Sequence, residues 1–158
     1  LSAVLQKLRD CGCQLEIDQT GISITPGDIQ AVDITTQPFP GFPTDLQAPF
    51  MALMATAQGT SVISEKIYEN RLQHVAELQR MGASIRVDGS TAIVEGVAQL
   101  SAAPVTGSDL RAAAAMVLAG LAANGTTKVS GLKHLDRGYD KVEAKLNAVG
   151  AQLERQQG

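Results

Sequence analysis

The feature that most constrains this chain is an internal repeat of about seventy residues. Three segments each join an amphipathic helical pattern, through a glycine turn, to a strand-like run. The turn glycines are Gly12, Gly82 and Gly150, which are spaced almost equally along the sequence. Self-similarity at a fixed spacing is the signature of a repeated structural unit. We therefore expect copies of one unit rather than a single irregular domain.

A second set of landmarks recurs in the same order and supports the repeat. In each unit an acidic residue opens an apolar segment, a Gly-Thr step closes it, and an arginine follows twelve positions after that glycine. These landmarks are Asp45, Gly59 and Arg71 in one unit and Asp109, Gly125 and Arg137 in the next. Each unit is thus predicted to run helix, strand, loop with arginine, helix, glycine turn and further strands.

Local signals place the expected elements. Helices are predicted over residues 2–10, from Asp45 and from Asp109, because aspartate is a preferred residue at a helix start. Strands are predicted over residues 61–64, 84–87 and 92–95. Residues 37–43 hold three prolines and a glycine, so this stretch should be a rigid, extended loop.

The segment from Asp109 to Ala123 has no polar side chain after Arg111. A helix that is apolar on every side must be buried on every side. The predicted fold is therefore a mixed α/β (α+β) prism that is inside out, with buried helices surrounded by sheets. The chain opens partway through a unit, so residues 1–158 are expected to form most of one domain, about two and a half units, and to be a fragment.

Composition excludes several classes of protein. The chain is 44% hydrophobic and 18% charged with a net charge of −3, which fits a globular protein with no general attraction for nucleic acid. Cys11 and Cys13 suit neither a disulfide framework nor a zinc site. The longest apolar run is shorter than the roughly 20 residues that span a bilayer, and no signal peptide pattern opens the chain. We expect a cytoplasmic protein.

Acids and arginines gather at the ends of the predicted elements and are the candidate site residues. Arginine binds carboxylates and phosphates with two parallel hydrogen bonds, and a carboxylate among arginines can take a proton from a hydroxyl that it touches. The residues concerned are Asp45, Asp109, Arg71, Arg111 and Arg137. No dinucleotide fingerprint, phosphate loop or metal motif is present, so neither a cofactor nor a metal is expected.

Simpler interpretations compete with this one. Asp45 and Asp109 would be ordinary helix caps, and Arg71 and Arg137 would form surface ion pairs worth about 0–1 kcal/mol. His74 and His134 have no partner pattern and are interpreted as structural. The residues alone predict a repeated α/β domain with an anion site and specify no reaction.

Four motifs in order resemble UDP-N-acetylglucosamine 1-carboxyvinyltransferases, which are enolpyruvyl transferases. They are PFPGFPTDLQ at residues 38–47, YENR at 68–71, SDLRA at 108–112 and HLDRGY at 134–139. The resemblance covers nearly the whole chain and corresponds to the C-terminal portion of such an enzyme. The related 5-enolpyruvylshikimate-3-phosphate synthases share the fold but have a different segment around the last Asp-Arg, so the resemblance favours the sugar-nucleotide enzymes. Such a synthase is the alternative interpretation, and a non-enzymatic repeat scaffold is the third.

The resemblance implies a fold and a reaction. Two similar domains, each of three units with helices inside, would face each other across a cleft that binds phosphoenolpyruvate and UDP-N-acetylglucosamine. The sugar 3-hydroxyl would attack phosphoenolpyruvate and inorganic phosphate would leave. This reaction is the first committed step of bacterial peptidoglycan synthesis.

The resemblance also assigns roles to residues of this chain. Asp45 would take the proton from the sugar hydroxyl, and Ile67 would contact the sugar nucleotide through its backbone. Arg71, Arg111 and Arg137 would line the phosphoenolpyruvate side, with Asp109 an acid close to the intermediate. The cysteine and lysine of the family would belong to the missing N-terminal domain, so the fragment alone should be inactive; neither Cys11 nor Cys13 matches that cysteine.

Overall fold

The computed structural model describes residues 1–156. The helices are α1 (Ser2–Asp10), α2 (Gln47–Met54), α3 (Val75–Arg80), α4 (Leu110–Ala122), α5 (Leu132–Leu135) and α6 (Val142–Ala148), with a short 3-10 turn η1 (Thr44–Leu46) before α2. The strands are β1 (Gln14–Ile17), β2 (Ile22–Thr25), β3 (Ile34–Thr35), β4 (Thr60–Ser64), β5 (Ser84–Asp88), β6 (Thr91–Glu95), β7 (Leu100–Ser101), β8 (Pro104–Thr106), β9 (Ala123–Asn124) and β10 (Lys128–Ser130).

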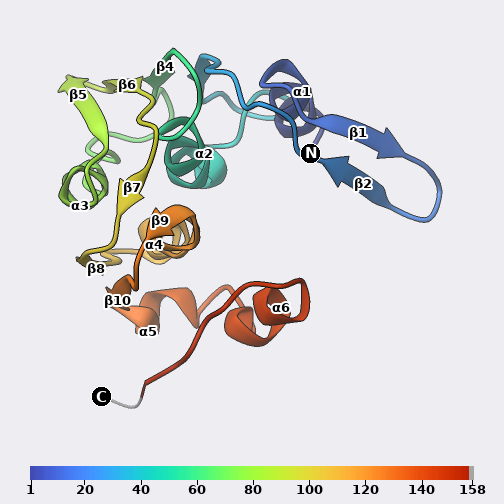
Figure 1. Ribbon diagram of the computed structural model, residues 1–158. Helices are drawn as coiled ribbons and strands as arrows, with labels where there is room; N and C mark the ends of the chain where they lie inside the picture. The colour runs from blue at the N-terminus through green and yellow to red at the C-terminus, as the bar shows by residue number, and fades with distance from the viewer. Residues whose placement is uncertain (157–158) are drawn as a thin grey trace.

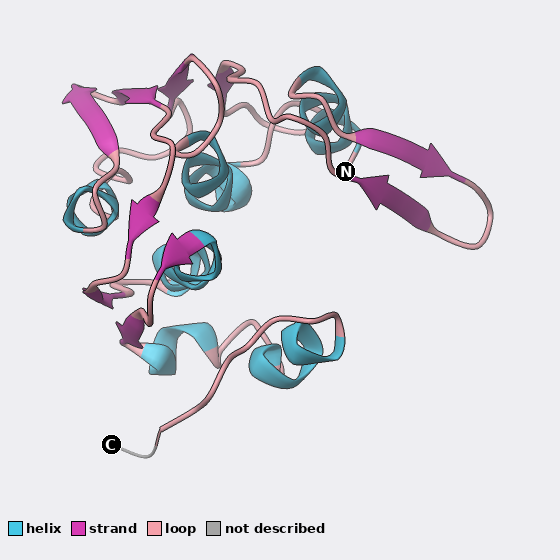
Figure 2. Ribbon diagram, in the orientation of Figure 1, coloured by secondary structure: helices cyan, strands magenta, loops and turns pink. Residues whose placement is uncertain are grey.

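Helices α2 and α4 pack against each other in the middle of the molecule, and short sheets lie outside them (Figure 1). The largest sheet has the strand order β3-β4-β6-β5 and lies beside α2 and α3, whereas β7 pairs with β9 and β8 with β10 next to α4. Figure 2 shows these strands mainly above and to the left of α2 and α4, with α5 and α6 below α4. The predicted mixed fold with helices inside and sheets outside is confirmed.

The buried helix predicted from Asp109 is confirmed for most of its length. Residues 112–117 and Ala119 of α4 are buried, and Met116 is fully enclosed. Near the C-terminal end, Leu118 and Leu121 are 43% and 41% exposed. The face of α4 against α2, α5 and the sheets is thus covered, while a narrow apolar edge at its end is not.

The predicted strands at 61–64, 84–87 and 92–95 correspond to β4, β5 and β6, each within one residue at either end. The helix predicted over residues 2–10 is α1. The helix predicted from Asp45 begins differently, because the chain first forms the 3-10 turn η1 and α2 starts only at Gln47. No helix within residues 1–156 is both long and apolar enough to cross a membrane.

The second and third repeat units have the same backbone pairing where two of their strands run parallel, a place called here the repeat crossing. In the second unit β3 and β4 are parallel and the Thr36 N–H donates to the Ser64 carbonyl at 2.9 Å. In the third unit β8 and β10 are parallel and the Gly107 N–H donates to the Ser130 carbonyl at 3.0 Å. Thr36 is therefore equivalent to Gly107, and Glu65, which follows Ser64, is equivalent to Gly131.

The two units differ by the proline-rich loop. In the third unit Asp109 follows Gly107 almost directly, whereas residues 37–43 are inserted between Thr36 and Thr44 in the second unit. The prediction that residues 37–43 are extended is wrong, because the loop turns back on itself: the Gly41 N–H donates to the Pro38 carbonyl at 2.8 Å and the Gln37 N–H to the Phe42 carbonyl at 3.0 Å. Phe42 is buried and packs edge-to-face on Phe50 at 5.4 Å, which anchors the loop to α2.

The first unit is represented by α1 and the β1–β2 hairpin. The hairpin extends away from the body of the molecule (Figure 1). Its residues Ile17, Ile22 and Ile24 are about half exposed. In the second unit the equivalent hairpin, β5–β6, pairs through β6 with β4, so β1–β2 lacks the sheet neighbours that its equivalent has within the part of the chain that the structure describes.

We predict that Gly131→Ala destabilises the protein more than Gly82→Ala. Both glycines have positive φ, +79° and +88°, so each alanine would incur the left-handed backbone penalty. A Cβ at Gly131 would also collide with the Gly107 carbonyl, whereas a Cβ at Gly82 would meet no atom within 4 Å. Urea unfolding of the full-length protein should give a loss about 1–3 kcal/mol larger for Gly131→Ala. Equal losses would contradict this packing of the third unit.

Candidate functional site

The site is built around the carboxylate of Asp45, which lies in η1 directly after the proline-rich loop. Its side chain is 68% exposed, and Oδ1 accepts a hydrogen bond from Arg111 Nε at 2.6 Å. Arg71 Nη1 lies 3.8 Å from the same oxygen. Two arginines that are far from Asp45 in the sequence thus converge on one carboxylate at the surface between two repeat units.

Asp45 is not a helix cap, in contrast to the simpler interpretation of the sequence. Neither η1 nor α2 has a hydrogen bond from a capping side chain. The side chain of Asp45 instead binds Arg111 of α4. The ion pair is exposed and so contributes only roughly 0–1 kcal/mol to stability. Such a weak pair can be rearranged at little cost when a ligand binds.

Asp109 does cap its helix, as the simpler interpretation predicted. Its Oδ1 accepts hydrogen bonds from the backbone N–H groups of Arg111 at 2.7 Å and Ala112 at 3.0 Å. This cap fixes the first turn of α4, from which the Arg111 side chain extends to Asp45. Asp109 therefore positions Arg111 through the backbone.

Arg71 is held from two sides. Its Nη1 donates to Thr44 Oγ1 at 2.7 Å, and its guanidinium carbon lies 4.1 Å from the centre of the Tyr68 ring. A guanidinium at this distance over an aromatic face is a cation–π contact. The Arg71 side chain is mostly buried whereas Tyr68 is largely exposed. The Tyr68 ring therefore lies between the Arg71 guanidinium and solvent.

The loop that carries Tyr68 and Arg71 is organised by the buried carboxylate of Glu65, which is 2% exposed. Oε1 accepts hydrogen bonds from Thr36 Oγ1 at 2.8 Å and from the N–H groups of Ile67 and Tyr68 at 2.8 and 3.1 Å. Oε2 accepts from Thr44 Oγ1 at 2.9 Å. Burial acts to raise the pKa of Glu65, but these hydrogen bonds outweigh it and leave the pKa below its usual range.

Ile67 is half-buried and its N–H is committed to Glu65. A backbone contact from Ile67 to a ligand would therefore use its carbonyl oxygen. The predicted backbone contact from Ile67 to a sugar nucleotide is thus restricted to the carbonyl group.

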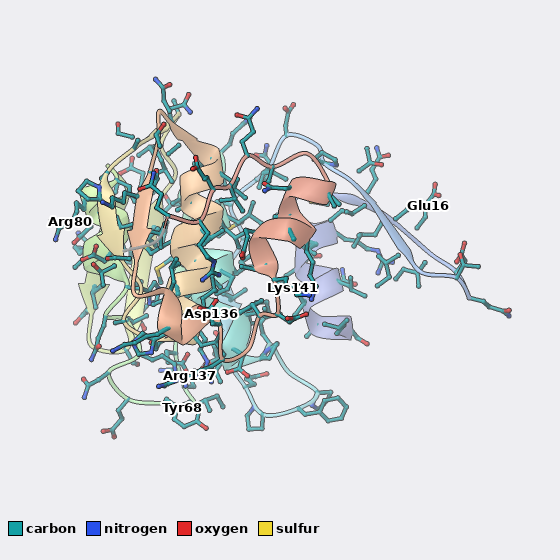
Figure 3. The ribbon with its side chains drawn as sticks, turned by 90° about the horizontal axis from the view of Figure 1, so that it is seen from below. Glu16, Tyr68, Arg80, Asp136, Arg137 and Lys141 are labelled. Atoms are coloured by element: carbon teal, nitrogen blue, oxygen red, sulfur yellow. The ribbon has the colours of Figure 1, made fainter. Side chains whose placement is uncertain are left out.

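Arg137 lies in the loop that follows α5 and is exposed. A Cβ at the next residue, Gly138, would be 2.9 Å from a methyl group of Leu110, so this loop runs close against the first turn of α4. In the view of Figure 3, Arg137 and Tyr68 lie along the same edge of the molecule. No ion pair within 4 Å is formed by Arg137 among residues 1–156, whereas its neighbour Asp136 pairs with Arg155 at 2.8 Å.

His74 is buried behind the site and its Nε2 has no hydrogen-bond partner among the described residues. Burial lowers the pKa of His74 to about 4, although the charge of Asp109 and the backbone carbonyl of Arg71 oppose this. The imidazole is therefore neutral near pH 7. A neutral, enclosed histidine fits the structural interpretation made from the sequence.

A surface hollow of about 260 Å³ lies between the 68–73 loop and the start of α4. Arg71 and Asp109 both line it, together with Tyr68, Glu69, Asn70 and Gln73. A complete small-molecule pocket typically has about 300–1,000 Å³ and encloses most of its ligand. The hollow is shallow and open to solvent, and Arg71 is the cationic side chain that lines it, so it forms at most part of a binding site.

The cysteines are remote from this chemistry. Cys11 and Cys13 are buried and unbridged. Burial, with a contribution from Cys13, raises the pKa of Cys11 to about 11, so it is a thiol near neutral pH. Within residues 1–156, no three histidine, cysteine or carboxylate side chains are grouped so that they could hold a metal.

Sequence reasoning missed Glu65, Thr36 and Thr44 as site residues. Glu65 follows a strand and has no motif of its own; its role arises because Thr36 and Thr44, distant in sequence, fold onto it. The repeat contained one signal for Glu65: the equivalent position in the next unit is Gly131, so the repeated fold itself does not require a glutamate there.

Comparisons with curated proteins give very similar relatives. The chain is 99% identical over 158 residues to UDP-N-acetylglucosamine 1-carboxyvinyltransferase of Parasynechococcus marenigrum (strain WH8102). It is 81% identical over 155 residues to the protein of the same name from Synechococcus sp. (strain CC9605) and 74% identical over 157 residues to that from Prochlorococcus marinus (strain MIT 9313). These alignments cover 98–100% of this chain but only 36% of each relative.

Solved structures share the fold. The enolpyruvyl transferase NikO from Streptomyces tendae matches 96% of this chain and 36% of its own with a TM-score of 0.87 and 28% identity. EPSP synthase from Acinetobacter baumannii matches 98% of this chain and 37% of its own with a TM-score of 0.74 at 20% identity, which supports the fold alone.

A family-wide comparison covers almost the whole chain. The family model for EPSP synthase (3-phosphoshikimate 1-carboxyvinyltransferase) matches residues 1–146. The match includes the proline-rich loop, the Asp45 site and both complete repeat crossings. This chain belongs to the EPSP synthase family.

Proposed function

We propose that this chain supplies half of the active site of a UDP-N-acetylglucosamine 1-carboxyvinyltransferase. The complete enzyme transfers the enolpyruvyl group of phosphoenolpyruvate to the 3-hydroxyl of UDP-N-acetylglucosamine and releases phosphate. The reaction belongs to peptidoglycan synthesis and takes place in the cytoplasm. The proposal agrees with the names of relatives that are 74–99% identical to this chain.

The observation that carries the proposal is the exposed Asp45 carboxylate between two arginines. Asp45 caps no helix, so its place after the rigid proline loop needs another explanation. Arg111 and Arg71 lie 2.6 and 3.8 Å from its Oδ1. A solvent-facing carboxylate beside two anion-binding groups suits a reaction in which a hydroxyl loses its proton next to a bound anion.

In the proposed reaction, Asp45 accepts the proton of the sugar 3-hydroxyl as that oxygen bonds to C2 of phosphoenolpyruvate. A proton is added at C3 by a group outside this chain, which gives a tetrahedral intermediate. Loss of a proton from C3 then restores the double bond as the bond from C2 to the phosphate oxygen breaks. Inorganic phosphate leaves, and no oxidant or cofactor is needed.

The arginines of this chain bind the anionic partner. Arg71 and Arg111 both approach Asp45 Oδ1, and Arg137 follows in the loop against the first turn of α4. Phosphoenolpyruvate carries a carboxylate and a phosphate, and guanidinium groups match both with paired hydrogen bonds. When such an anion draws Arg111 away, Asp45 loses a weak ion pair and becomes available to the sugar hydroxyl.

The remaining site groups come from a partner domain of the same enzyme. The chain spans about a third of the length of its curated relatives, and the hollow beside Arg71 and Asp109 is shallow and open to solvent. Residues 1–158 are proposed to form most of one domain, about two and a half units. Closure of the partner domain over the hollow would complete the site and exclude water.

The alternative acceptor is the one used by EPSP synthase, 3-phosphoshikimate. It is supported by the name of the matching family model. The high identity to proteins named for the sugar nucleotide favours UDP-N-acetylglucosamine. A scaffold that only binds other proteins gives no reason for two arginines to converge on an exposed carboxylate.

We predict that the full-length enzyme releases phosphate from phosphoenolpyruvate when UDP-N-acetylglucosamine is added and not when 3-phosphoshikimate is added. A colorimetric phosphate assay with each acceptor measures this. Release with 3-phosphoshikimate alone would replace the proposed acceptor with the alternative one. No release with either would overturn the proposed activity.

Asp45→Asn in the full-length enzyme should reduce turnover by about 10²–10⁴-fold, because the amide cannot accept the hydroxyl proton. Stability should change little, since Asp45 forms no cap and only an exposed ion pair. Phosphate release and thermal unfolding measure the two effects separately. Asp88→Asn, at an exposed hairpin end, is the matched control and should leave both unchanged. Normal turnover in folded Asp45→Asn enzyme would remove Asp45 as the base.

The isolated chain of residues 1–158 should release no phosphate from phosphoenolpyruvate and UDP-N-acetylglucosamine. It provides Asp45 and three arginines but no group to protonate C3 of phosphoenolpyruvate. The same phosphate assay, run on a sample free of full-length enzyme, tests this. Sustained turnover would show that the chain carries a complete site.

A further inference from the structure

Glu65 is a buried carboxylate that forms no ion pair within 4 Å among residues 1–156. It is 2% exposed and holds its charge through four hydrogen-bond donors. Taking a carboxylate out of water is costly unless it is fully hydrogen-bonded. Burying this carboxylate therefore costs free energy that an apolar side chain would not, so we expect a role that only the carboxylate can perform.

The direction of the hydrogen bonds links Glu65 to the catalytic groups. An ionised carboxylate only accepts, so Thr44 Oγ1 must give its single proton to Glu65 Oε2 at 2.9 Å. Its lone pairs then face Arg71 Nη1, which donates at 2.7 Å. Glu65 thus orients the Thr44 hydroxyl as an acceptor for Arg71, and the same Nη1 lies 3.8 Å from Asp45 Oδ1.

The third repeat unit shows that the fold does not require this carboxylate. There the residues equivalent to Thr36 and Glu65 are Gly107 and Gly131, with the same backbone hydrogen bond beside them. A Cβ at Gly131 would collide with the Gly107 carbonyl, so no side chain fits. Two glycines build the same crossing that the second unit builds with a threonine and a buried glutamate.

The carboxylate occurs in the unit that carries the inserted loop, and it binds both ends of the insertion. Thr36 immediately precedes residues 37–43 and Thr44 immediately follows them. Glu65 accepts from the first hydroxyl at 2.8 Å and from the second at 2.9 Å. The base of the loop is thereby closed directly beside Asp45.

We propose that Glu65 is a positioning residue, whose carboxylate closes the base of the proline-rich loop and orients Thr44 so that Arg71 and Asp45 keep their places. The inference rests on the proposed function for its kinetic consequence. Glu65 itself touches no substrate; it acts through Thr44 and through the N–H groups of Ile67 and Tyr68.

The substitution Glu65→Gln preserves shape and reverses one set of hydrogen bonds. If the amide nitrogen faces Thr44, both it and Arg71 donate to one hydroxyl. If it faces the other way, it meets the Thr36 hydroxyl and the N–H groups of Ile67 and Tyr68. In the first orientation the Thr44 oxygen can accept both N–H groups, but its own proton loses the acceptor at residue 65, so the hydroxyl is no longer oriented. In the second orientation an amide N–H meets the N–H groups of Ile67 and Tyr68, so in either case part of the network fails.

In the full-length enzyme, Glu65→Gln should lower kcat for phosphate release by about 10–100-fold, the size expected when catalytic groups shift by less than about 1 Å. Thr44→Val, which removes the linking hydroxyl, should lower kcat similarly, and Thr44→Ser should recover most of it. Because both changes break one path, the double variant should be no slower than the slower single variant. The exposed Glu95→Gln, beside Ser84, is the matched control and should turn over normally.

A local measurement tests the same inference without substrates. Amide hydrogen exchange in the full-length protein should be faster at Ile67 and Tyr68 in Glu65→Ala, which removes the acceptor of both N–H groups, than in the wild type, with no such change in Glu95→Ala. Unchanged exchange at both amides would overturn the positioning role, even if the proposed reaction proved wrong.

The kinetic outcomes separate the two proposals. Wild-type enzyme that releases no phosphate with UDP-N-acetylglucosamine overturns the proposed function, and hydrogen exchange then decides the positioning role. Active wild type with normal kcat in folded Glu65→Gln overturns the positioning role alone. A lower melting temperature with normal kcat would give Glu65 a structural role only, and a double variant slower by the product of both single effects would exclude action through Thr44.

Discussion

The need to bury α4 sets the geometry on which the site depends. Its side chains are apolar almost all round, so the helix can lie only between other elements. It packs along α2, and the two helices begin next to each other, as the 2.6 Å hydrogen bond from Arg111 to Asp45 shows. Hydrophobic burial in the centre thereby brings the polar starts of two repeat units together at the surface, where the candidate chemistry lies.

From that shared frame the two units have diverged. Asp109 caps α4 by accepting hydrogen bonds from N–H groups of its first turn. Asp45, at the equivalent position, caps no helix and instead accepts a hydrogen bond from Arg111. The second unit contains the proline-rich insertion and a buried glutamate at its base, where the third unit has Gly107 and Gly131. Asp109 caps its helix, whereas Asp45 forms no cap and remains available for the proposed chemistry. A repeat thus provides an internal comparison that separates what the fold needs from what the site needs.

Much of the fold could be predicted from the sequence because its signals are local or periodic. The apolar run after Asp109, the strands at 61–64 and 92–95 and the spacing of the glycine turns all depend on neighbouring residues. The site was less accessible. Whether Asp45 caps its helix depends on where Arg111 lies, and Glu65 matters only through Thr36 and Thr44, to which no sequence pattern connects it. Arg71 and Arg137 were paired by the repeat, yet only Arg71 is held by contacts to its neighbours within residues 1–156, to Thr44 and Tyr68.

We propose that the Asp45 carboxylate receives the proton of the acceptor hydroxyl. The most direct measurement is a crystal structure of the full-length enzyme with UDP-N-acetylglucosamine bound, in which the distance from Asp45 to the sugar 3-hydroxyl can be read. We expect one carboxylate oxygen about 2.5–3.0 Å from that hydroxyl, the range of an O–H···O hydrogen bond. A 3-hydroxyl bound instead by another acidic side chain, with Asp45 still paired to Arg111 and beyond hydrogen-bond reach, would contradict the account.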